Sequence, residues 1–352
     1  MQSDTSTGGQ GRGQIRSALD AAAPASRIKG DLVVGTMASG ASIAIPYVAV
    51  KGARPGPCLW VNGQVHGVEI NGILAALDFV NGLDPQAMTG TVIVTGTANP
   101  LAFDARRKAA PQDDNDLDQT FPGRDSGFIA ERMAALFFRE AKECADLLIS
   151  MHTNSPQFDG KPYGVYKQHP NGKVSEHELL LYQAAFDPSV CCHMSIEPGR
   201  GELLGNIAGA IDYQLLAIGI PAFMIELGGG QRAEPAFIAQ AVKGMRAAAR
   251  RLGVLPDEPA PALPASVRKV TRRGHVTFDR GGLYRARRVP GEVVKAGEVH
   301  GEVMDLYGDV VQTMKLPYDA IVICMRRDPV VHTGDRFVYV GQEWSDYPLD
   351  RA

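Results

Sequence analysis

The sequence predicts an α/β fold followed by a smaller all-β unit. In the first two thirds of the chain, short apolar runs typical of strands alternate with segments whose apolar residues recur at helical spacing. Beyond a proline-rich stretch, short strand-like runs are punctuated by glycines. Alternating strands and helices favour a largely parallel sheet flanked by helices, whereas the final part suits a small β-sandwich or barrel.

The elements of the first part are expected in the following order along the chain. Strands are expected over residues 31–37, 42–50, 57–64, 91–100, 145–153 and 221–230, and helices over residues 68–80, 129–142, 203–218 and 235–252. In the last part, strand-like runs occur over residues 281–286, 291–305, 320–327 and 335–340.

Changes in composition predict the domain boundaries. Residues 1–26 begin polar and glycine-rich and are expected to form a flexible tail, and residues 27–255 form the main domain. Four of the ten residues from 256 to 265 are proline, so residues 256–266 are predicted to be a stiff linker. Residues 267–345 then form the small β domain.

Composition excludes several classes of protein. With 45% apolar and 21% charged residues and a net charge of −3, the chain is an ordinary globular protein with no bulk charge for nucleic acid or an anionic membrane. No apolar run approaches the roughly 18 residues of a membrane span. Five cysteines without a CxxC spacing argue against a disulfide framework, so we expect a cytoplasmic protein.

Polar residues that can hold a metal occur where three predicted strands end. His66 and Glu69 follow one strand in NGQVHGVEING, His152 ends another in SMHTN, and Glu226 lies in MIELGGG. A His/Glu/His set that leaves one coordination position open is how catalytic zinc sites are built. Glu226 would then be the carboxylate that takes and returns the proton. A lone HxxE is often accidental, and a histidine after a strand is usually just a polar group at the end of the strand. The prediction therefore rests on the occurrence of all three strand-end sites in one chain.

Five motifs together resemble the succinylglutamate desuccinylase/aspartoacylase family, which is related to the zinc carboxypeptidases. They are VNGQVHGVEING, TANPLAFDARRK, DLDQTFPG, LLISMHTN and MIELGGG. The resemblance covers roughly residues 30–340 and is strongest to the longer bacterial branch that includes N-acetyl-diaminobutyrate deacetylases. It implies a mixed or parallel sheet flanked by helices, one Zn²⁺ per chain and a small-molecule amide substrate.

Carried over residue by residue, the resemblance makes His66, Glu69 and His152 the zinc ligands and Glu226 the general acid/base. Asn99 matches the family's NP turn and is taken as a substrate-site residue. Where the family usually has an arginine that polarises the scissile carbonyl, this chain has Lys108, and the adjacent Arg107 can substitute for it by a small shift. A lysine supplies charge without the bidentate guanidinium fork.

The family's Asn-Arg clamp for a substrate carboxylate is replaced here by Asp118 and Gln119. We therefore expect the substrate to be a neutral amide, or one with an amine near the cleaved bond, and not an ordinary N-acyl amino acid held by its α-carboxylate. Two alternatives stay open. The acidic run is a solvated loop, or Arg106, Arg107 or Arg124 supplies the missing charge.

The sequence thus predicts a zinc-dependent amidohydrolase that removes an acyl group from a small amine. A carboxypeptidase-like peptidase and a degenerate, non-catalytic binding protein are the alternatives. Residues 267–345 contain no clustered His/Glu/Asp set and are expected to be non-catalytic, narrowing the entrance or supporting a homo-oligomer. Glu197 and Arg200 are further candidates for a substrate loop, and a structural ion pair explains them equally well.

Overall fold

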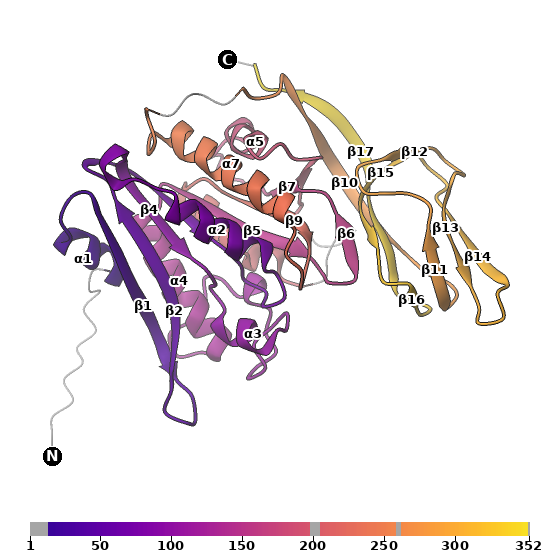
Figure 1. The fold of residues 1–352 in the computed structure, drawn as a ribbon, viewed down its shortest axis with the longest axis horizontal. Helices are drawn as coiled ribbons and strands as arrows, with labels where there is room; N and C mark the ends of the chain where they lie inside the picture. Colours follow the sequence, from indigo (N-terminus) through magenta and orange to yellow (C-terminus); the bar gives the residue numbers. More distant parts are fainter. Residues whose placement is uncertain (1–12, 198–204, 258–261, 351–352) are drawn as a thin grey trace.

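The computed structural model describes residues 13–197, 205–257 and 262–350. It consists of a large mixed sheet with helices on both faces and a smaller β unit at one edge (Figure 1). The expected α/β architecture with a smaller C-terminal β part is therefore confirmed. No helix in these ranges is long and apolar enough to cross a membrane.

The elements have the following bounds. The α-helices are α1 (Gln14–Ala21), α2 (Asn71–Asn81), α3 (Pro100–Ala105), α4 (Ile129–Cys144), α5 (Glu176–Ala184), α6 (Ile211–Ile218) and α7 (Pro235–Leu252). The strands of the main part are β1 (Ser26–Thr36), β2 (Ser42–Lys51), β3 (Arg54–Asn62), β4 (Thr89–Thr95), β5 (Leu147–Asn154), β6 (Phe158–Gly160), β7 (Tyr163–Tyr166), β8 (Cys191–His193) and β9 (Ala222–Gly229). The C-terminal strands are β10 (Ser266–Thr277), β11 (Gly282–Ala286), β12 (Val293–Val294), β13 (Val299–Met304), β14 (Val310–Lys315), β15 (Ala320–Arg326), β16 (Val330–Val331) and β17 (Arg336–Pro348).

The centre of the large sheet is parallel, in the order β4-β3-β5-β9. β1 and β2 add an antiparallel edge beside β4, and β7 pairs antiparallel with β9. β8 then pairs with β10, so the strands of the C-terminal unit continue the same sheet. The carboxyl ends of β3, β5 and β9 consequently meet at one edge of the parallel part, where α/β sheets place their sites.

Strand alternation divides the core of the main part into two layers. Leu59 and Val61 of β3 pack with α2, α5 and α7, whereas Cys58 and Trp60 of the same strand pack with α1 and α4. Both faces of the parallel strands are therefore covered, which explains their nearly continuous apolar sequence.

Two expectations need correction. Residues 14–21, expected to belong to a flexible tail, form α1, because Ile15 and Leu19 are buried and Glu140 of α4 accepts hydrogen bonds from the backbone N–H groups of residues 14 and 15. The rest of the predicted tail up to residue 12 lies outside the described residues. The helix expected over 203–218 begins only at Ile211, after a 3-10 turn (Ile207–Gly209), and residues 203 and 204 are not described.

The C-terminal unit has the form of a small sandwich. The four-stranded sheet β14-β13-β11-β16 packs against the ends of β10, β15 and β17 around Phe278, Tyr284 and Phe337. Residues 258–261 of the predicted linker lie outside the described residues. β10 and β17 run beside one another between the main part and this sandwich, as Figure 1 shows. Side chains of both strands can therefore reach the main domain.

Candidate metal centre and active site

The loop after β3 holds two of the predicted metal ligands close together. The backbone N–H of Glu69 donates to the carbonyl of His66 at 3.0 Å, which makes a tight turn. Gly67 lies inside this turn, where a Cβ atom would approach the carbonyl oxygen of Ala102 to 1.9 Å. Only glycine fits there, so α3 packs directly against the loop and holds it in place.

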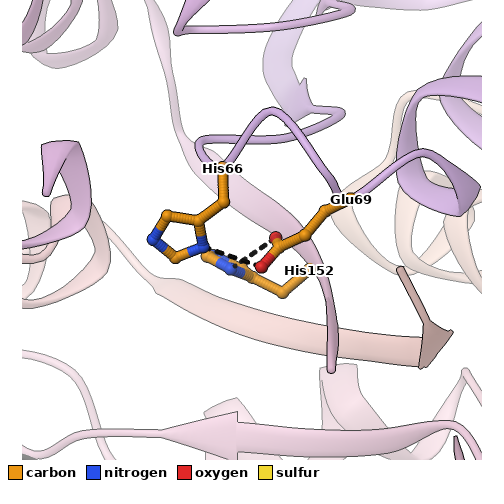
Figure 2. Close-up of side chains that lie close together, drawn as sticks. All are labelled: His66, Glu69 and His152. Carbon is orange, nitrogen blue, oxygen red and sulfur yellow. Dashed lines mark hydrogen bonds and ion pairs between the residues drawn. The ribbon is translucent and has the colours of Figure 1, made fainter. Parts of the chain in front are cut away.

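His66, Glu69 and His152 form a buried group whose ligand atoms lie within 4.8 Å of one another. Figure 2 shows both imidazoles directed at the carboxylate: Nδ1 of His66 lies 2.7 Å from Oε1 of Glu69, and Nδ1 of His152 lies 3.1 Å from Oε2. The second contact has the distance of an ion pair without hydrogen-bond alignment, since Oε2 has no hydrogen-bond partner among the described residues. An incompletely satisfied buried carboxylate between two imidazoles fits a divalent cation bound by all three.

The outward nitrogen of each histidine is also fixed. Nε2 of His66 lies 2.9 Å from Oδ1 of Asp116, and Nε2 of His152 lies 3.1 Å from Oγ of Ser150. Such partners orient a metal-ligating imidazole and set its tautomer. Asp116 is a residue that the sequence argument missed as a partner of His66, because it lies 50 positions away in what reads as an acidic loop.

Charge coupling within this group is strong. Burial lowers the pKa of His66, but the charge of Glu69 and hydrogen bonds to Asp116 and Glu69 outweigh it and raise this pKa well above 6.5. Burial raises the pKa of Glu69, yet the two histidines hold it at about 2. Glu69 is thus ionised, and a metal cation could take the place of the proton that it stabilises on His66.

Glu226 lies beside this group on the neighbouring strand. His152 of β5 and Glu226 of β9 are register partners in the parallel sheet. Oε2 of Glu226 is buried and has no hydrogen-bond partner among the described residues. Burial is the main cause that raises the pKa of Glu226 to about 7, and the charge of Glu69 adds to the increase. A carboxyl group with such a pKa can both accept and donate a proton near neutral pH.

Two cavities meet at these residues. The outer one has a volume of about 480 Å³ and the inner one about 210 Å³. Residues that line both cavities mark their junction: His66, Glu69, Lys108, Met194, Glu226 and Arg336. The candidate metal group and Glu226 therefore lie at this junction. They would face the middle of a molecule that spans the two cavities.

Of the two residues proposed to polarise the carbonyl, Lys108 lies at the cavities and Arg107 does not. Nζ of Lys108 lies 2.7 Å from Oδ2 of Asp116, and Lys108 lines both cavities. Arg107 instead pairs with Asp114 at the surface and does not line the described cavities. Asn99 is also outside them: its side chain caps α3 by accepting from the N–H of Ala102 and donates to the carbonyl of Val65. Its position is that of a buried capping residue and not of a substrate contact.

Asp118 and Gln119 both line the inner cavity. Oδ1 of Asp118 is buried without a hydrogen-bond partner among the described residues, and burial raises the pKa of this carboxyl group to about 6. The amide oxygen of Gln119 accepts from the backbone N–H of Asn206 at 3.0 Å. Asp118 therefore presents a carboxyl oxygen to the cavity, whereas Gln119 is engaged with the adjacent loop.

The C-terminal unit contributes side chains that the sequence did not single out. Arg273 of β10, Ile323 of β15, and Arg336 and Tyr339 of β17 line the outer cavity. That this unit narrows the entrance stays a prediction. The other candidates lie elsewhere. Arg124 pairs with Glu131, Arg106 and Glu197 are exposed outside both cavity linings, and Arg200 is outside the described residues.

The ends of the strands in this α/β sheet thus bring together a His/Glu/His group that could hold a metal ion and a carboxyl group that can transfer a proton. The profile of the succinylglutamate desuccinylase/aspartoacylase catalytic domain matches residues 55–252. The chain belongs to this family of deacylases.

The individual relatives that follow share less than a quarter of their aligned residues with this chain. The N-alpha-acetyl-L-2,4-diaminobutyric acid deacetylase of Halomonas elongata is 24% identical over 309 residues, which is 86% of this chain and 86% of that protein. The product-bound ectoine utilization protein EutE (DoeB) from Ruegeria pomeroyi has a TM-score of 0.77 and 23% identity, covering 90% of this chain and 95% of that one. A succinylglutamate desuccinylase/aspartoacylase from Rhodobacter sphaeroides has a TM-score of 0.76 and 23% identity, covering 91% and 95%. These structures have the same fold.

Proposed function

We propose that the chain is a zinc-dependent deacylase that hydrolyses the amide bond of a small N-acyl amine or amino-acid derivative. The observation that carries the proposal is the position of Glu226: its unpartnered carboxyl oxygen lies on the strand next to His152, beside a His/Glu/His group that fits a divalent cation. Family membership supports the deacylase class. A protein that only binds a small molecule would not need both the complete His/Glu/His group and Glu226.

His66, Glu69 and His152 would hold the metal, and Glu226 would handle the proton. A bound Zn²⁺ would polarise the amide carbonyl and lower the pKa of a bound water. Glu226 accepts the proton of the attacking water at its unpartnered oxygen and then delivers it to the leaving nitrogen. Lys108, held by Asp116, places a positive charge at the junction, where negative charge develops on the carbonyl oxygen.

The sizes of the cavities suggest how such a substrate lies. The inner cavity is small, and part of its wall is apolar, formed by Val165, Met194, Ile207, Ala210 and Met224. We propose that it receives a short acyl group such as acetyl. The larger outer cavity would receive the amine half, and the Halomonas relative, named for an N-acetylated diamino acid, makes that class of substrate the first to test.

We also propose that the chain has two domains and is cytoplasmic. Residues 27–255 would form the catalytic domain, with residues 267–345 as a β domain that borders the site. None of the five cysteines, which all lie in the described part of the chain, forms a disulfide, and this supports a reducing, cytoplasmic environment.

The direct experiment is to load the purified protein with zinc and measure release of free amine from a panel of N-acetyl and N-succinyl compounds. Amide hydrolysis that disappears on chelation and returns with zinc is the expected result. C-terminal peptides in the same panel address the peptidase alternative. A zinc-loaded protein that binds panel compounds without cleaving any of them would contradict the proposal and favour a binding role.

A further inference from the structure

The two cavities differ in the charge that they offer to a ligand. The outer cavity is lined by three cationic side chains, Lys108, Arg273 and Arg336, and by two carboxyl groups, Glu69 and Glu226. Glu69 already faces the two histidines. Lys108 is paired with Asp116, so the positive charge that the outer cavity offers to a ligand comes from Arg273 and Arg336 of the C-terminal unit.

Arg336 is the cation of this set that is both well placed and unneutralised. Its Nη1 donates to the hydroxyl group of Tyr339, and its guanidinium carbon lies 5.2 Å from the centroid of the same ring. Among the described residues, no carboxylate forms an ion pair with it. Tyr339 therefore holds the guanidinium against the cavity wall from one side, which leaves its other N–H groups available.

Apart from Arg336 at the junction, the inner cavity offers no unpaired lysine or arginine to an anion among the described residues. Lys108 is paired with Asp116, and Nζ of buried Lys167 lies 2.8 and 2.9 Å from the two carboxylate oxygens of Asp212. Three carboxyl groups that line this cavity each have an oxygen without a hydrogen-bond partner among the described residues: Glu69, Asp118 and Glu226. A second carboxylate placed beside Asp118 would meet like charge in a site that is largely shielded from water.

We propose that Arg336 binds a carboxylate on the amine half of the substrate in the outer cavity, and so makes the enzyme selective for N-acylated amino acids over N-acylated simple amines. This inference rests on the proposed deacylase function. Arg336 of β17 would then bind the substrate carboxylate, which Gln119 cannot do because its amide carries no charge.

The position of Arg336 also limits where that carboxylate lies on the substrate. Arg336 lines both cavities together with Glu226, so the group it binds is close to the bond that Glu226 serves. An α-carboxylate, one carbon from the amide nitrogen, meets this condition. This proposal differs from the expectation based on Asp118 and Gln119, because Arg336 is distant from them in the sequence.

The test uses a matched pair of substrates that differ only in the carboxylate: N-alpha-acetyl-2,4-diaminobutyrate and N-acetyl-1,3-diaminopropane. kcat and KM are measured for the zinc-loaded wild type and for Arg336→Met and Arg336→Lys. The control is Arg272→Met, which removes an exposed arginine of β10 paired with Glu343. Calorimetric binding of the two products, 2,4-diaminobutyrate and 1,3-diaminopropane, gives a readout that does not require turnover.

The wild type should prefer the carboxylate in both assays. Arg336→Met should raise KM for the amino-acid substrate about 10- to 100-fold and leave the simple amine unaffected, since a charge-assisted bidentate contact is lost. Arg336→Lys should lie between, and Arg272→Met should match the wild type.

Two results would overturn the inference. One is a wild type with no preference for the carboxylate in either assay. The other is an equal loss of kcat on both substrates in Arg336→Met, which would mean that Arg336 acts on the shared carbonyl. Binding selectivity for 2,4-diaminobutyrate in a protein that cleaves neither substrate would support the carboxylate site while contradicting the deacylase proposal.

Discussion

Nε2 of His66 lies 2.9 Å from Oδ1 of Asp116, so the imidazole is held between two carboxylates, with Glu69 on its other nitrogen. The ring cannot rotate without losing both contacts. Nδ1 is thereby kept facing the place where a metal would bind, and this preorganisation extends to Lys108 through the second oxygen of Asp116.

Replacing Asp116 with asparagine should weaken zinc binding about 10- to 100-fold, the usual consequence of removing the charged partner of a ligating histidine. Competition with a chromogenic chelator measures the affinity. Asp114→Asn is the matched control, since Asp114 is an exposed neighbour that pairs with Arg107. Equal affinities in the two variants would show that Asp116 does not support the metal.

The wild type should contain one zinc per chain, and a His66→Ala, His152→Ala double variant should contain none, because two of the three proposed ligands are gone. Elemental analysis of the purified proteins gives the stoichiometry. His332→Ala, at an exposed histidine of the C-terminal unit, should keep its zinc. Full zinc content in the double variant would refute the ligand assignment.

Zinc affinity should rise with pH, and binding should release protons. Glu69 and Asp116 raise the pKa of His66 above its usual value, so in the metal-free protein the ring keeps its proton to a higher pH and must lose that proton before it ligates. Affinity is therefore lowest in acid and increases until pH passes this raised pKa. Calorimetry in buffers of different ionisation enthalpy counts the protons, and zero release near pH 7 would contradict the account.

The residues at strand ends could be predicted from the sequence because parallel strands bring their carboxyl ends to one edge. His66, Glu69, His152 and Glu226 are brought together for that reason. The helix α1 was missed because its surroundings are polar. The spacing of Ile15 and Leu19 was the available signal.

Arg273 and Arg336 could not be found in the same way. No local pattern marks them, since they reach the cavity only because β10 extends the main sheet and β17 pairs with β10. Arg106, Arg107 and Arg124 are close to Gln119 in the sequence, whereas the packing of the C-terminal unit brings Arg336 to the cavity from more than 200 positions away.

Restoring the family clamp should change the preferred acyl group. Asp118→Asn with Gln119→Arg removes a carboxyl group from the inner cavity and adds a guanidinium, so N-succinyl substrates should gain on N-acetyl ones. The expected change in the ratio of kcat/KM is about tenfold or more, from a charged hydrogen bond of roughly 1.5–3 kcal/mol. An unchanged ratio would mean that the acyl group does not enter the inner cavity.

We propose that Glu226 moves the proton in a reaction organised by His66, Glu69 and His152. This proposal is tested most directly by the turnover of zinc-loaded Glu226→Gln on the best substrate, with zinc content matched to the wild type. Glu343→Gln, at an exposed glutamate of β17, is the control. We expect Glu226→Gln to keep its zinc and its product binding while kcat falls about 10²- to 10⁴-fold. A kcat within a few-fold of wild type would contradict it, because another group would then be the base.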